Sequence, residues 1–146
     1  MTVLLDSFAV LALLKGEPAA PQVHALVESE DAELTCLGVA EIVDHLVRIV
    51  GVTEEDAALD LAQLGLIGPQ PLDPGVALRA GHLRARHYHR RTCAVSLADC
   101  VVASAAQLQG APVATADPHL LDVCAREHIA VVPLPDSNGE TWSAVG

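Results

Sequence analysis

The sequence predicts an α/β fold, a single α/β/α sandwich around a central, mostly parallel five-stranded sheet. Short apolar runs alternate along the chain with stretches of helical spacing, which is the pattern of repeated strand and helix units. Hydrophobic residues make up 51% of the 146 residues, yet only Phe8, Tyr88 and Trp142 are aromatic. An aliphatic core of this kind suits a sheet that is covered on both faces.

The N-terminal part predicts a strand followed by two helices. Residues 2–5, TVLL, form a β-rich run, and Asp6 or Ser7 can cap a helix that continues through Leu14. Pro18 and the apolar spacing after it predict a second helix, which ends before the polar stretch SEDAE.

The next part predicts a second strand and two more helices. Residues 34–37, LTCL, are the strand, and the amphipathic helix after them ends at Gly51, a residue favoured at helix C-termini. Thr53, with Asp56 three residues later, resembles a capping box that opens a helix through about Leu64.

The basic part of the chain predicts two helices separated by a short strand. Asp73 and Pro74 form a helix start, with the aspartate as the cap and the proline at the first helical position. Residues 93–95, CAV, are the expected third strand. Ser96 and Asp99 then form a second box-like start, for a helix that ends at a glycine.

The C-terminal part predicts the last strand and helix units. Residues 112–115, PVAT, are the fourth strand, Asp117 with the proline after it starts the last helix, and residues 129–132, IAVV, are the fifth strand. We therefore expect one domain over residues 1–132. A tail of residues 133–146 either packs on this domain or extends from it.

The N-terminal sequence, the cysteines and the net charge indicate where the protein acts and what it does not bind. The apolar N-terminus lacks a basic segment and is interrupted by Asp6, so we expect neither a signal peptide nor a membrane span, and a cytoplasmic protein. The four cysteines contain no Cys-x-x-Cys pair and are expected to be reduced, mostly buried thiols. The net charge of -11 argues against a protein that coats nucleic acid non-specifically.

Four carboxylates stand where strands give way to helices or on the helices that follow: Asp6, Glu41, Asp99 and Asp117. In an open α/β sheet the carboxyl ends of the strands face one crevice, so the four side chains would share one location. Clustered carboxylates repel one another, and a hard cation is the expected compensation. The alternative is that the aspartates merely cap helices and that Glu41 faces solvent.

The order of these motifs resembles the PIN-domain ribonucleases, especially toxins of the VapC type. The motifs are Asp6-Ser7 after the first strand, Glu41 within AEIV, Ser96 to Asp99 within SLAD, and Thr115 to Asp117 within TAD. The resemblance implies a PIN-like fold and a metal-dependent endoribonuclease. It also implies a cognate antitoxin that silences the toxin, and a homodimer.

The same resemblance implies roles for individual residues. Asp6, Glu41, Asp99 and Asp117 would be the catalytic residues and would bind Mg²⁺ or Mn²⁺, and Thr115 would orient a water or a phosphate oxygen. The chain departs from the family at Leu120, where phenylalanine is common, and in its acidity. The first departure changes packing, and the second concerns affinity for RNA.

A basic segment, RAGHLRARHYHRR, precedes the SLAD motif. Arg84, Arg86, Arg90 and Arg91 are the expected RNA-binding residues, because arginine forks contact phosphates. The alternative is a solvated helical face that balances acidic neighbours. Tyr88 is the segment's only aromatic residue, so little base stacking is expected.

Two functions therefore remain open from the sequence. The first is a metal-dependent endoribonuclease that is the toxin of a toxin-antitoxin pair. The alternative is a catalytically weak or inactive PIN-like module for binding or regulation, whose acidic pocket receives a basic segment of a partner.

Overall fold

The computed structural model of the protein describes residues 1–144, except for the side chains of residues 67–70, and confirms the predicted α/β sandwich. One parallel sheet of five strands has the order β3-β2-β1-β4-β5. The strands are β1 (Thr2–Leu5), β2 (Asp31–Thr35), β3 (Ile67–Gln70), β4 (Val113–Thr115) and β5 (Val131–Pro133). The helices are α1 (Ser7–Lys15), α2 (Ala20–Ser29), α3 (Cys36–Asp44), the π-helical segment η1 (His45–Val50), α4 (Glu54–Ala62), α5 (Pro74–His87), α6 (Leu97–Gln109) and α7 (Pro118–Arg126).

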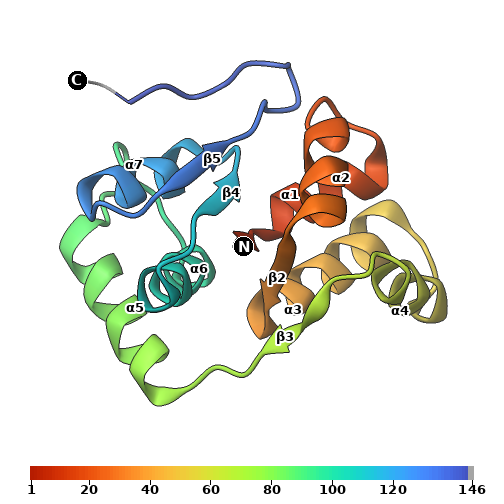
Figure 1. The fold of residues 1–146 in the computed structure, drawn as a ribbon, viewed down its shortest axis with the longest axis horizontal. Helices are drawn as coiled ribbons and strands as arrows, with labels where there is room; N and C mark the ends of the chain where they lie inside the picture. Colours follow the sequence, from red (N-terminus) through yellow and green to blue (C-terminus); the bar gives the residue numbers. More distant parts are fainter. Residues whose placement is uncertain (145–146) are drawn as a thin grey trace.

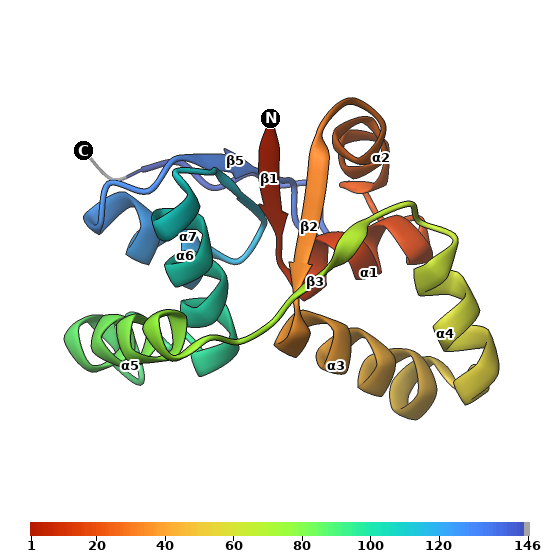
Figure 2. The ribbon, with the colours of Figure 1, turned by 60° about the horizontal axis from the view of Figure 1, so that its bottom comes forward.

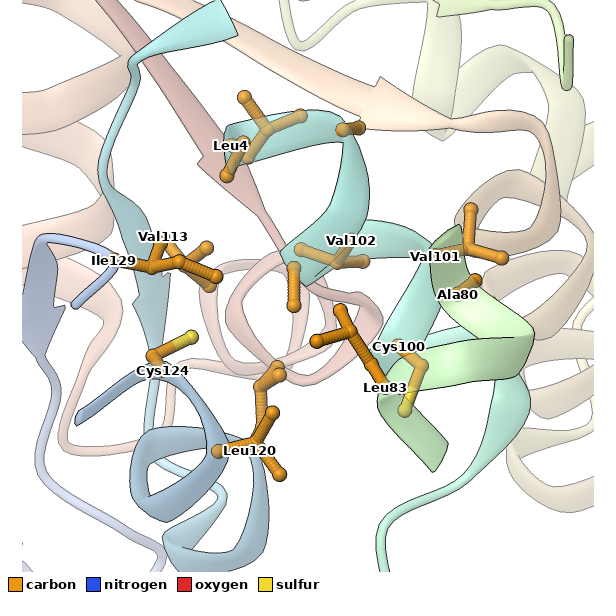
Figure 3. Close-up of a cluster of buried hydrophobic side chains, with 14 of the residues drawn as sticks. Leu4, Ala80, Leu83, Cys100, Val101, Val102, Val113, Leu120, Cys124 and Ile129 are labelled. Carbon is orange, nitrogen blue, oxygen red and sulfur yellow. The ribbon is translucent and has the colours of Figure 1, made fainter. Parts of the chain in front are cut away.

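Helices cover both faces of the sheet, α1 to α4 one face and α5 to α7 the other (Figures 1 and 2). Successive side chains of β1 alternate between the two resulting cores. Val3 and Leu5 pack with the first group of helices, whereas Leu4 packs with the second. Figure 3 shows the second core, in which Leu4, Leu83 and other aliphatic side chains fill the space between the sheet and its helices.

Most predicted helix boundaries are confirmed by their caps. The side chains of Asp6, Thr53 and Asp73 each accept a hydrogen bond from the backbone N–H three residues later. Gly51 and Gly110 end their helices in the left-handed region that favours glycine, with φ of 90° and 65°. Local capping chemistry therefore determines these boundaries.

The second strand was predicted too late in the sequence. It covers Asp31–Thr35 instead of residues 34–37, because Thr35 ends the strand and caps α3 by accepting a hydrogen bond from the Gly38 N–H at 3.0 Å. The run LTCL thus spans a strand end and a helix start. The fifth strand likewise begins two residues later than predicted, at Val131.

The third predicted strand was wrong. Residues 93–95 form no strand, and Cys93 only makes an isolated antiparallel bridge with His89. The third strand in the sequence is β3, at the edge of the sheet. A Gly68-Pro69 pair is more typical of a turn than of a strand, because proline has no N–H to donate to a neighbouring strand. An edge strand nevertheless tolerates proline.

The tail folds back along the sheet through the last described residue, 144 (Figure 1). Leu134 is fully buried, and its N–H donates to the Thr115 carbonyl at 2.9 Å. Farther on, the Trp142 Nε1–H donates to the Asp122 carboxylate at 2.9 Å. These contacts place the start of the tail beside the carboxyl end of β4 and residue 142 against α7.

Three of the four thiols are buried, as expected: Cys93, Cys100 and Cys124, whereas Cys36 is exposed. No helix among residues 1–144 is both long and apolar enough to cross a membrane.

Candidate active site

The order in which the chain adds strands to the sheet reverses between β1 and β4. After β1 the chain continues to β2 and β3 on one side of it, and then returns to build β4 and β5 on the other side. At such a switch point the loops leave the strands in opposite directions and open a crevice at the strands' carboxyl ends. Asp6 follows β1, and Asp117 follows β4 by two residues. The topology therefore places both aspartates at the crevice.

Asp6 is held in place by two donors beneath this crevice. Only 4% of the residue is exposed. Its carboxylate accepts a hydrogen bond from the Ala9 N–H at 2.9 Å and another from the Thr115 hydroxyl. The Thr115 oxygen in turn accepts from the Asp117 N–H at 3.0 Å. Thr115, itself fully buried, thus links the two aspartates and fixes their spacing.

Asp99 comes from the first turn of α6, where a capping box holds it. The Asp99 N–H donates to Ser96 Oγ at 3.0 Å, and the Ser96 N–H donates to the Asp99 carboxylate at 3.2 Å. This confirms the box that the sequence predicts. The carboxylate is half-buried and lines the same cleft as Asp117.

All four predicted carboxylates line one cleft of about 470 Å³: Asp6, Glu41, Asp99 and Asp117. Glu41 reaches the cleft from α3 and is exposed. Thr115 lies beneath the cleft, where it contacts Asp6 and Asp117. The structure therefore brings together the residues that the motifs marked separately.

The electrostatics of the cleft disfavour its own negative charge. Burial raises the pKa of Asp6 to about 7, and the charges of Asp99 and Asp117 add to this effect against the hydrogen bonds from Thr115 and Ala9. Burial, followed by the charge of Asp117, raises the pKa of Asp99 to about 6. Carboxylates arranged in this way bind protons or cations more readily than isolated ones.

A hard divalent cation fits this donor set. Carboxylate oxygens are the ligands that Mg²⁺ prefers, and the charges of Asp99 and Asp117, which contribute to the raised pKa of Asp6, would attract a cation. Within residues 1–144, no three His, Cys, Asp or Glu side chains converge closely enough to form a complete ligand set. Mg²⁺ usually keeps several waters and is bound by one or two carboxylates.

Two of the predicted RNA-binding arginines, Arg84 and Arg86, line different grooves. Arg84 donates through Nε to the Val95 carbonyl at 3.0 Å, and Arg86 pairs with Glu127 at 2.7 Å. Arg90 and Arg91 are exposed in the turn that follows α5. For the four arginines together, the structure thus confirms neither a solvated helical face nor an RNA-binding surface.

Sequence reasoning missed two residues of the tail that also line the cleft, Asp136 and Ser137. Asp136 accepts hydrogen bonds from the Asn138 and Glu140 N–H groups at 2.9 and 3.0 Å. The run Asp-Ser-Asn-Gly is typical of such a side-chain turn, so the turn could have been predicted. Its place beside the cleft could not, because packing alone brings the tail there.

Comparisons with known proteins agree with this site. The family model described as PIN domain matches residues 3–126. No curated protein matches the chain.

Several solved structures share the fold. VapBC2 from Rickettsia felis, bound to a DNA fragment from its promoter, has a TM-score of 0.63 and 15% identity over 90% of this chain and 98% of its own. FitAcB from Neisseria gonorrhoeae has a TM-score of 0.64 and 20% identity over 88% and 95%. VapC20 from Mycobacterium tuberculosis, described as a toxin that cleaves the sarcin-ricin loop, has a TM-score of 0.60 and 15% identity over 76% and 86%.

Proposed function

Because the chain belongs to the PIN domain family, we propose that it is a nuclease that hydrolyses RNA phosphodiester bonds with Mg²⁺ or Mn²⁺. The family membership predicted from the motifs is confirmed. One observation carries the proposal: Asp6, Asp99 and Asp117, from three separate segments, line one cleft, in which burial and neighbouring charge raise the pKa values of Asp6 and Asp99. A merely structural set of helix caps has no need to converge in this way.

The proposed chemistry assigns a task to each residue of the cleft. A divalent cation bound there would supply the positive charge that hydrolysis of a phosphodiester requires. Asp6 and Asp99 would be its main ligands, and Glu41 and Asp117 would complete the site directly or through waters. Thr115 would keep Asp6 and Asp117 at a fixed spacing, since its oxygen bonds with both residues.

We further propose that the protein is the toxin of a toxin-antitoxin pair, acts in the cytoplasm and forms a homodimer. Structures that share its fold include a toxin-antitoxin complex from Klebsiella pneumoniae, with 18% identity and a TM-score of 0.60. A cognate antitoxin with a basic segment would complement the acidic cleft and could displace a cation from it.

The direct test is cleavage of a mixed RNA pool by the purified protein with Mg²⁺, with Mn²⁺ and with EDTA. We expect cleavage with either metal and none with EDTA. In Asp6→Asn the side chain keeps its shape and can still cap α1, but a ligand charge is lost, so cleavage should cease.

Asp73→Asn is the matched control. Asp73 caps α5 in the same way that Asp6 caps α1, but it does not line the carboxylate cleft. Cleavage that survives in Asp73→Asn and is lost in Asp6→Asn would support the nuclease. Folded wild-type protein that binds a basic partner peptide and cuts no RNA would instead favour the binding module. Full activity in Asp6→Asn would contradict the site itself.

A further inference from the structure

We propose that a groove beside the catalytic cleft binds one unpaired nucleotide of the RNA, with Tyr88 and Leu97 contacting its base. This inference rests on the proposed nuclease function and extends it. The groove has a volume of about 300 Å³ and is lined by Gly81, Arg84, Ala85, Tyr88 and Leu97. Its size lies at the lower end of the ~300–1,000 Å³ that is usual for ligand sites.

The walls of this groove suit a nucleobase. Tyr88 and Leu97 are large hydrophobic residues that remain 45% and 55% exposed. Gly81 and Ala85, which also line the groove, are small residues exposed on α5. Arg84 lies over one face of the Tyr88 ring, so a flat base would contact the parts of the ring and of Leu97 that remain exposed. Stacking of this kind is tolerant of sequence, because every base has a π face.

Arg84 holds the groove in shape and gives it positive charge. Its guanidinium lies 4.2 Å from the centre of the Tyr88 ring, and its Nε donates to the Val95 carbonyl. This arrangement restricts both the arginine and the ring, so less conformational entropy is lost when a ligand binds. A cation next to an aromatic ring also matches a ligand that has a base and a phosphate.

The groove adjoins the catalytic cleft at the start of α6. Ser96 lines the cleft and Leu97, the next residue, lines the groove. The Arg84 side chain also lies near this point. Its Nε donates to the carbonyl of Val95, the residue before Ser96. In the proposed complex, RNA bound at the carboxylates extends to Tyr88 across the start of α6.

The other side of α5 has a different character. Arg79, His82 and Arg86 line a separate groove with Glu127. There Arg79 donates to Gln107 at 2.9 Å, and Arg86 pairs with Glu127. Both arginines bond to other side chains that line this second groove. Of the arginines first expected to bind RNA, the structure thus assigns Arg84 to the nucleotide groove and Arg86 to a contact between helices.

The test measures binding of two probes by fluorescence anisotropy in an Asp6→Asn background, in which the RNA stays intact. One probe is a fluorescent uridine decamer, and the other is a decamer of abasic ribose phosphates with the same charge. We expect Tyr88→Ala to weaken binding of the uridine decamer on the order of 10-fold and to leave binding of the abasic decamer unchanged. Tyr88→Phe, which keeps the ring, should bind like the parent protein.

Arg79→Ala is the control for charge, since it removes a cation from the opposite groove of the same helix. It should affect both probes equally and only slightly. An equal effect of Tyr88→Ala on both probes, or no effect, would overturn the nucleotide groove. So would a change of molar mass in Tyr88→Ala, measured by light scattering, because it would show that a second copy of the chain covers Tyr88.

Failure of the nucleotide groove and failure of the proposed nuclease function would give different results. Wild-type protein that cuts RNA in the presence of a metal, with Tyr88→Ala binding uridine like its parent, would refute the groove alone. Wild-type protein that cuts no RNA would refute the nuclease, whatever Tyr88 does.

Discussion

Helices α1 and α5 begin in the same way but in different surroundings. Each has an aspartate cap whose Oδ1 accepts a hydrogen bond from the N–H three residues later, at 2.9 Å in both cases. Asp6 is 4% exposed at the centre of the sheet, whereas Asp73 is exposed at the end of the loop after the edge strand β3. Asp6 also experiences the charges of Asp99 and Asp117. The same local motif is therefore a simple cap in one place and part of a charged cleft in the other.

The largest expected difference between Asp6 and Asp73 lies in catalysis. Asp6→Asn should lower the rate of metal-dependent RNA cleavage by more than about 100-fold, because loss of a direct metal ligand costs at least as much as loss of a supporting group. Asp73→Asn should leave the rate within about 2-fold of wild type, since exposed substitutions away from a site have small effects. Single-turnover rates at saturating Mg²⁺ measure both. Equal losses in the two variants would remove the distinction.

The second prediction concerns stabilisation by a cation. At pH 8, Mg²⁺ at about 100 times its dissociation constant should stabilise the wild-type fold by about 2.7 kcal/mol, which can be followed as a rise in Tm. The rise should persist in Asp73→Asn and be much smaller in Asp6→Asn. It should also be smaller at pH 5, where Asp6 and Asp99, with pKa values of about 7 and 6, are mostly protonated. A rise independent of pH and of Asp6 would place the cation elsewhere.

The third prediction concerns pH in the absence of divalent metal. Asp6 and Asp99 have pKa values of about 7 and 6 in the folded protein and 3.8 as the reference, so between these values the folded state binds more protons than the unfolded state. Their contribution to stability is thus fully present below about pH 4 and is lost as pH rises through 6 and 7.

The measurement is urea unfolding with EDTA at pH 5 and at pH 8. We expect the wild type to lose at least about 1 kcal/mol more than Asp6→Asn over this interval, because one pKa unit corresponds to about 1.4 kcal/mol. Asp73→Asn should follow the wild type. A pH profile shared by all three proteins would show that Asp6 ionises in the folded state as it does in water.

The smallest expected effect is that of the caps themselves. Asp73→Ala should lower the free energy of unfolding by about 1 kcal/mol, the usual cost of losing an aspartate cap. Asp6→Ala at pH 8 with EDTA should cost less or even stabilise, because removal of a buried carboxylate offsets the lost cap. Thermal unfolding of both variants checks this. A greater loss of stability in Asp6→Ala than in Asp73→Ala would mean that the hydrogen bonds of Asp6 with Ala9 and Thr115 stabilise the fold by more than the burial of its carboxylate destabilises it.

The parts of the fold that were predicted correctly depend on local chemistry. The caps at Asp6, Thr53 and Ser96 and the glycines that end two helices need only neighbouring residues to act, so the sequence reveals them. The errors lie where tertiary context prevails. The run CAV was predicted as a strand and is not one, whereas the Gly-Pro segment in β3 becomes an edge strand because Glu33 and Thr35 of β2 offer it a partner.

The candidate site shows the same division. The motifs marked the four carboxylates and Thr115, but the contribution of Asp136 and Ser137 was missed because they belong to a tail without a motif. The basic segment was treated as one set of four arginines. The structure separates Arg84 from Arg86, because residues two positions apart on a helix point in different directions.

The sequence by itself determined the alternation of strands and helices, the starts of most helices and the identity of the acidic residues, because propensity and capping act over a few residues. Only the tertiary structure decided that Asp6 is a buried carboxylate with a raised pKa and that Asp73 is an exposed cap. Burial and charge repulsion depend on distances between segments far apart in the chain. Those distances are fixed by the order of the strands in the sheet.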